Sequence, residues 1–251
     1  MKQEEIGHHF LAKLGKTRLR PGGKAATDWL ISNGDFRKDK KVLEIACHVG
    51  TTAISIAKQF GCEVVGVDLD EEALEKARSN IAENEVADLV KVQKADATEL
   101  PFEDNSFDIV LNESILTLLP NEAKQKAIQE YLRILKPNGL LLTHDVLLNT
   151  AESETLLEQL RETLNISVTP LTKEGWKNTF LTCGFRNVET FTGEFNLLSP
   201  KDLIQDEGVI GAMKIIGNAL KAENRDTFKK MFKTFKDPEH KLGFIAICSQ
   251  K

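Results

Sequence analysis

The chain has 251 residues, enough for one large domain with its own hydrophobic core. Its formal net charge is −5, so it lacks the overall positive field that a nucleic-acid-binding protein uses. The four cysteines form no CxxC pair, which argues against a zinc site or a disulfide framework. No apolar run is long enough to span a bilayer, and the polar start is unlike a signal peptide. We therefore expect a cytoplasmic protein without a bound metal, and no membrane or nucleic-acid partner.

Residues 1–34 contain a Pro-Gly-Gly break at 21–23, which predicts a helix, a turn and a second helix that begins near Gly23. From residue 41, short β-branched segments alternate with amphipathic ones, a pattern typical of a parallel sheet covered by helices. The expected strands are 41–46, 63–68, 89–95, 107–114, 139–146, 186–195 and 241–250. The expected helices are 51–60, 71–84, 123–135, 151–164 and one within 173–185 that stops at Gly184.

This order predicts the α/β class, with a Rossmann-like doubly wound sheet of about seven strands. Two helical additions accompany the sheet, one at the N-terminus and one before the last strand. We expect a single domain over 1–251, made of a helical N-terminal cover (1–34), a cofactor-binding core (41–195), a helical insertion (196–240) and the last strand (241–250).

The turn after the first strand decides between two nucleotide cofactors. A dinucleotide site would have G-x-G-x-x-G here, but Ala46, His48 and Thr51 occupy the three glycine positions. Glu44 adds a negative charge near the strand end, which would repel a pyrophosphate and attract a ligand that carries an ammonium and a sulfonium. The turn therefore favours S-adenosylmethionine over NAD. The His48 ring either contributes to this turn or points into solvent.

Several motifs together resemble one enzyme family. Glu44, Ala46, His48 and Gly50 occupy the four positions of an acid-x-Gly-x-Gly-x-Gly motif, of which only the last glycine is kept. Further matches lie at 95–97, 100–102, 107–108, 132–142 and 176–185. With them the chain resembles the methyltransferase type 11 group of the class I S-adenosylmethionine-dependent methyltransferases, over residues 41–195. In that family the last strand of the sheet is antiparallel.

The resemblance implies S-adenosylmethionine as cofactor and a set of residues around it: Glu44, Ala46, Cys47, Gly50, Asp68, Leu69, Asp96, Ala97, Asn112 and Glu113. Asp68 would accept both ribose hydroxyls, and its alternative use is to cap the next helix. Asp96 would accept from the adenine amine and Ala97 would contact the ring, unless Asp96 is an ordinary loop acid. Asn112 and Glu113 end the fourth strand, which the resemblance places beside the sulfonium and the acceptor.

Methyl transfer from a sulfonium mainly requires alignment and exclusion of water, so no base is obligatory. If the acceptor must lose a proton, His144 and Glu113 are the candidate catalytic residues, with Asp145 also available at the same strand ends. The alternative for His144 is a hydrogen-bonding role at its strand end.

Residues 1–34 and 196–240 flank the regular alternation, which predicts a lid over a small-molecule acceptor. Their apolar residues would line the pocket: Phe10, Leu14, Trp29, Met213, Ile216, Phe228 and Phe232. Arg18 or Arg20 would contact an acidic group of the acceptor, and Met213 its apolar part. The alternatives are ordinary core packing or a homodimer interface. Two rival functions also remain: a non-catalytic S-adenosylmethionine-binding or regulatory protein, and an NAD-dependent oxidoreductase.

Overall fold

A sheet of eight strands forms the centre of the computed structural model, which describes residues 7–18, 20–150, 154–195, 197–235 and 241–251. The strand order is β3-β2-β1-β4-β5-β8-β7, and β6 pairs with β5 beside this path. The strands are β1 (Lys41–Ile45), β2 (Glu63–Asp68), β3 (Val90–Lys94), β4 (Phe107–Glu113), β5 (Leu135–Leu148), β6 (Leu171–Thr172), β7 (Arg186–Glu194) and β8 (Leu242–Gln250). β8 runs antiparallel to β5 and β7, whereas the other pairs are parallel. The predicted fold class is confirmed.

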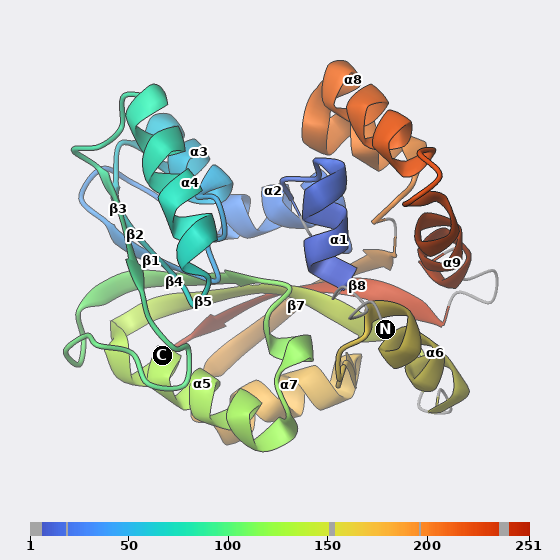
Figure 1. The fold of residues 1–251 in the computed structure, drawn as a ribbon. Coiled ribbons are helices and arrows are strands. Elements are labelled where there is room, and N and C mark those ends of the chain that lie inside the picture. The colour runs from blue at the N-terminus through green and yellow to red at the C-terminus, as the bar shows by residue number, and fades with distance from the viewer. Residues whose placement is uncertain (1–6, 19, 151–153, 196, 236–240) are drawn as a thin grey trace.

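Helices cover both faces of the sheet (Figure 1). On one face lie α2 (Gly23–Asn33), α3 (Thr51–Phe60) and α4 (Glu71–Glu83), and on the other lie α5 (Asn121–Ile134) and α7 (Lys173–Thr182). Each face has its own core, with Leu30 and Ile56 in one and Tyr131 and Trp176 in the other. β1 runs between them with little exposed surface, so its apolar residues Val42, Leu43 and Ile45 are buried on both faces of the sheet.

The boundaries of these helices follow from particular residues. Gly50 before α3 and Gly61 after it are both left-handed, a conformation that glycine adopts without steric cost. Asp70 caps α4 by accepting hydrogen bonds from the backbone N–H groups of Glu72 and Ala73. The predicted ends of both helices therefore agree with the structure to within one residue.

Two features of the sheet differ from the sequence-based expectation. β5 begins at Leu135, directly after α5, because Leu135 pairs with Phe107 and the register then shifts before Ile109 pairs with Leu140. Residues 136–138, which separate the expected helix 123–135 from the expected strand 139–146, are thus an irregularity inside a strand. The two-residue strand β6 was not expected, and it forms only by pairing with the end of β5.

The two helical additions lie together beyond the ends of the strands (Figure 1). They comprise α1 (Gly7–Leu14), α8 (Pro200–Ala219) and α9 (Arg225–Phe235), and α6 (Glu154–Leu164) packs beside them, whereas α2, the second helix of the predicted N-terminal cover, packs on the sheet. Phe10, Leu14 and Met231 are buried in a third core that these helices share. Parts of the predicted segments, 1–6, 19, 196 and 236–240, fall outside the described residues. None of the described helices is both long and apolar enough to cross a membrane.

Candidate active site

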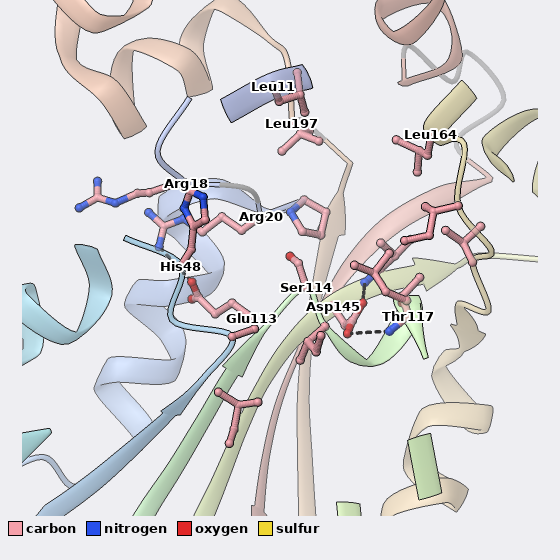
Figure 2. Close-up of a pocket in the computed structure, with 18 of the residues that line it drawn as sticks. Leu11, Arg18, Arg20, His48, Glu113, Ser114, Thr117, Asp145, Leu164 and Leu197 are labelled. Atoms are coloured by element: carbon pink, nitrogen blue, oxygen red, sulfur yellow. Dashed lines mark hydrogen bonds and ion pairs between the residues drawn. The ribbon is translucent and has the colours of Figure 1, made fainter. Parts of the chain in front are cut away.

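A cavity of about 430 Å³ lies where β1, β2 and β4 end at their carboxyl termini, beneath the helical additions. Open α/β sheets bind ligands at this edge. One part of the cavity is polar, and it is lined by residues such as Glu44, His48 and Asp68. The other part, which we call the apolar lobe, is lined mainly by Leu11, Leu118, Leu160, Leu164, Val168, Leu197 and Phe235. Figure 2 shows the two parts, with His48 and Glu113 on one side and Leu164 on the other.

The backbone conformation of the turn between β1 and α3 explains why glycine is typical at three positions of the family motif. Ala46, His48 and Gly50 all have positive φ angles, of 55°, 48° and 75°. This region strains a residue that has a Cβ atom, so the first two positions hold their conformation at some cost in stability. The His48 ring lines the cavity, and burial lowers its pKa against the attraction of Asp68. Gly50 does not line the cavity, and it acts as the N-cap residue of α3.

Glu44 is a buried acid that lacks a full set of partners. Its residue is only 7% exposed, and Oε2 has no hydrogen-bond partner within the described part of the chain. Burial, reinforced by the nearby charge of Glu113, raises the pKa of Glu44 to about 8. A positively charged ligand group at this position would supply the missing interaction. The unpaired carboxylate oxygen of Glu44 therefore fits S-adenosylmethionine, the cofactor that the sequence of this turn predicts.

Asp68 holds the two loops that border the polar part. Its Oδ2 accepts from the backbone N–H of His48 at 2.8 Å, and its Oδ1 accepts from that of Asp70 at 3.0 Å. Because Asp70 caps α4, the capping alternative for Asp68 does not hold. Asp68 and Cys47 both line the cavity, as expected for residues beside the cofactor.

Four other predicted cofactor residues are absent from the cavity wall. Leu69 is 60% exposed. Asp96 is exposed and accepts from the backbone and side chain of Thr98, and the bond from the Thr98 backbone is the largest cause of its lowered pKa. Ala97, next to it, packs against the core, and an adenine contact by this pair stays a prediction. Asn112 is fully buried, and its amide donates to Thr143 at 2.9 Å.

Glu113 is held by the N-terminal cover. The Thr27 hydroxyl donates to its Oε1 at 2.6 Å, and Arg20 Nη1 lies 3.5 Å from its Oε2. Burial alone would raise the pKa of Glu113, but Arg20, the His144 ring 3.8 Å away and the hydrogen bond from Thr27 outweigh burial and lower it to about 2. Glu113 is thus a stable carboxylate at the edge of the cavity, and so weak a base is poorly suited to proton removal.

His144 lies behind the cavity wall. Its residue has no exposed surface, and its Nε2 accepts from the backbone N–H of Gly22 at 3.0 Å. The ring also packs edge-on against Phe244. The structure therefore places His144 in the hydrogen-bonding role that the sequence allowed as the alternative, away from the position that a catalytic base needs.

The predicted acceptor residues are only partly where we expected them. Arg18 and Arg20 line the cavity, but Arg20 is already paired with Glu113 and with Asp206 on α8, at 3.1 Å from the latter. Arg18 donates to the backbone oxygen of Asp206 at 2.9 Å. Met213 is wrong as a pocket residue, because it is 68% exposed and does not line the cavity. Ile216 and Phe232 are likewise exposed at 42% and 38%, and none of the seven predicted apolar residues lines the cavity.

Other lining residues were not predicted from the sequence, apart from Asp145, which was named as a group available at the strand ends. Ser114 follows β4 with a φ of 61°, and its buried hydroxyl has no partner among the described residues. Asp145 accepts from the backbone N–H groups of Thr117 and Val146, at 3.1 and 2.7 Å, and burial raises its pKa. The apolar wall from α6 and residues 166–170 carries no motif. Only the strand-end position of Ser114 gave a signal, and it did not specify a role.

Comparison with known proteins supports one family. Residues 42–139 match the methyltransferase domain family. The chain is 66% identical to an uncharacterised Haemophilus influenzae protein over 100% of both chains. It is 33% identical to the 27-O-demethylrifamycin SV methyltransferase of Amycolatopsis mediterranei, over 62% of this chain and 57% of that one. The Haemonchus contortus phosphoethanolamine N-methyltransferase 2 structure has the same fold, with a TM-score of 0.78 at 20% identity, over 97% of this chain and 56% of that one.

The chain is a methyltransferase with the fold of the class I S-adenosylmethionine-dependent enzymes. The enzyme class and cofactor predicted from the sequence are thereby confirmed, and an NAD-dependent oxidoreductase is disfavoured. The chain matches only about half the length of the relatives that have a named activity. The acceptor of this methyltransferase does not follow from those names.

Proposed function

We propose that the protein transfers a methyl group from S-adenosylmethionine to a small organic acceptor that binds in the apolar lobe. The observation that carries this proposal is the single cavity that joins the acidic ends of β1 and β2 to an apolar lobe roofed by the helical additions. Its volume of about 430 Å³ lies within the usual range of small-molecule sites.

In this proposal, the residues of the polar part bind and orient the cofactor. Asp68 accepts the ribose hydroxyls, and the unpaired oxygen of Glu44 faces the positively charged methionine end. When bound, S-adenosylmethionine supplies a methyl group on a positively charged sulfur, which is already activated for displacement. The chain then has to align the acceptor and exclude water, and neither task needs a side-chain base.

The helical additions act as the lid in the same proposal. The lid is held by a buried network in which Arg20 and Lys16 of the N-terminal segment both pair with Asp206, at 3.1 and 3.3 Å. The backbone N–H and hydroxyl of Thr17 donate to Glu207, each at 2.8 Å. The assignment of the whole chain to one domain, its cytoplasmic location and a homodimer stay predictions.

The test combines binding with turnover. Calorimetry first measures the affinity for S-adenosylmethionine and for NAD. The protein is then incubated with S-adenosylmethionine and a protein-free extract of bacterial small molecules, and S-adenosylhomocysteine is quantified. We expect product only when extract and protein are both present. Tight cofactor binding without turnover would instead favour a non-catalytic binding protein, and preferential binding of NAD would refute the proposal.

A further inference from the structure

The turn after β4 stands between the two parts of the cavity, and it contributes an unpaired polar atom. Ser114 lines the cavity, and its hydroxyl is buried without a hydrogen-bond partner in the described residues. Its left-handed backbone, with a φ of 61°, is stabilised by a 2.7 Å hydrogen bond from its N–H to the His144 carbonyl. Strained residues with unpaired polar groups are typical of functional sites. In Figure 2 the Ser114 side chain points into the cavity.

Charge in the cavity is the second observation. The acidic lining residues are Glu44, Asp68, Asp70, Glu113 and Asp145, whereas the only guanidinium groups in the described lining are those of Arg18 and Arg20. Burial raises the pKa of Glu44 and of Asp145, so these two hold a proton more readily than an exposed acid. Even when both are counted as neutral, three carboxylates face two guanidinium groups.

Neither guanidinium group faces an anion that would bind in the apolar lobe. The Arg20 guanidinium lies between Asp206 and Glu113, and its side chain is only 5% exposed. The Arg18 guanidinium donates to the backbone oxygen of Asp206 at 2.9 Å, and in Figure 2 its side chain extends away from the apolar lobe. A carboxylate or phosphate on the acceptor would therefore enter a region of net negative charge and lose its hydration without a cationic partner.

Resting on the function proposed above, we propose that the acceptor is a largely apolar, non-anionic molecule that presents one hydroxyl or amine group to the Ser114 side chain. The Ser114 hydroxyl both accepts and donates hydrogen bonds, so it can receive the O–H or N–H of the reacting group. The apolar lobe takes the rest of the molecule, and the acidic surroundings reject anionic analogues. Ser114 is thus a specificity-determining residue, and Arg18 and Arg20 serve the lid rather than the acceptor.

The test uses three probes with the same alkyl chain: octan-1-ol, octylamine and octanoate. Each is titrated by calorimetry into protein saturated with S-adenosylhomocysteine, whose own binding is measured first. We expect the tighter of the two donor probes to bind at least about tenfold more strongly than octanoate, because desolvating an unpaired charge costs more than one good hydrogen bond returns. Failure to bind S-adenosylhomocysteine would count against the proposed function, whereas a wrong probe order counts against this inference alone.

Variants of Ser114 locate the effect. Ser114→Ala and Ser114→Gly both remove the hydroxyl, and glycine also accepts the left-handed backbone, so it guards against misfolding. We expect each folded variant to bind the preferred probe about three- to tenfold more weakly, the range for one net hydrogen bond, with S-adenosylhomocysteine binding unchanged. Ser79→Ala, on the exposed face of α4, is the matched control. Octanoate binding as tightly as the donor probes, no binding of any probe, or unchanged affinity in Ser114→Gly would overturn the inference.

Discussion

Glu44→Gln should remove a pH dependence of cofactor binding. Without ligand, burial and the charge of Glu113 raise the pKa of Glu44 to about 8, so the group is mostly protonated near neutral pH. A cationic ligand prefers the carboxylate, so binding must first ionise Glu44. Affinity therefore rises with pH up to that pKa, and binding releases a proton. Glu113, whose charge acts most strongly on Glu44, has a pKa of about 2 and therefore stays ionised throughout this pH range.

The size of the effect follows from the ionised fraction. With a pKa of about 8, Glu44 is ionised to about 1% at pH 6 and about 9% at pH 7. Only protein with an ionised Glu44 binds the cofactor well, so the apparent dissociation constant varies inversely with the ionised fraction. S-adenosylmethionine should therefore bind about ninefold more tightly at pH 7 than at pH 6. This window lies below the titration of the ligand's own amino group, whose pKa is roughly 8 or higher.

Calorimetry in two buffers of different ionisation enthalpy measures both the affinity and the protons released. We expect release of nearly one proton per cofactor at pH 7 in the parent protein and little release in Glu44→Gln, whose affinity stays nearly constant between the two pH values. Because other titrating groups act equally on both proteins, their contribution cancels in the comparison. The same pH slope in both proteins would refute the role given to Glu44.

Three further predictions concern residues around the cavity. Asp68→Ala should weaken S-adenosylmethionine binding by about 1–3 kcal/mol in calorimetry, because a charged acceptor is lost, and unchanged affinity in a folded variant would remove Asp68 from the site. Arg20→Met should lower the free energy of unfolding, measured in urea, by about 3 kcal/mol. This value is the lower end of the range for breaking a buried ion pair, because Lys16 still pairs with Asp206 in the variant. The exposed-pair control Arg78→Met should cost less than about 1 kcal/mol, and equal effects would contradict the reasoning. His144→Ala should lower the free energy of unfolding by about 2–4 kcal/mol, because the buried ring and its hydrogen bond with the Gly22 N–H are lost. Its pH–rate profile should keep the parent's shape, and a changed shape would restore His144 as a base.

The scaffold was predictable because its signals are local. The α3 and α4 boundaries follow from Gly50, Gly61 and Asp70, whose conformations depend on neighbours in the sequence. The start of β5 and the existence of β6 depend on pairing with distant strands, so no local sequence pattern predicts them. Glu44 and Asp68 could be assigned to the site because the carboxyl ends of parallel strands meet at one edge.

Residues 196–240 were predicted to be helical, but the packing of these helices was not predicted. Periodicity in 196–240 indicated helices, but α8 carries apolar residues on more than one side, so the pattern did not tell which side faces inward. Ile215 and Ala212 are buried, whereas Ile210 and Met213 face outward. The pairing of Arg20 with Asp206 joins residues far apart in the chain, and it turned an expected acceptor contact into a support of the lid.

The position of β8 affects how the protein forms during synthesis. It is the last strand in the sequence, yet it lies between β5 and β7. A ribosome-bound chain that ends before residue 242 therefore holds two strands whose backbone groups are unpaired on the sides that β8 will fill. Open edges of this kind favour aggregation, so nascent chains should depend on chaperones until residues 242–250 emerge. Loss of these nine residues would leave the sheet open between β5 and β7.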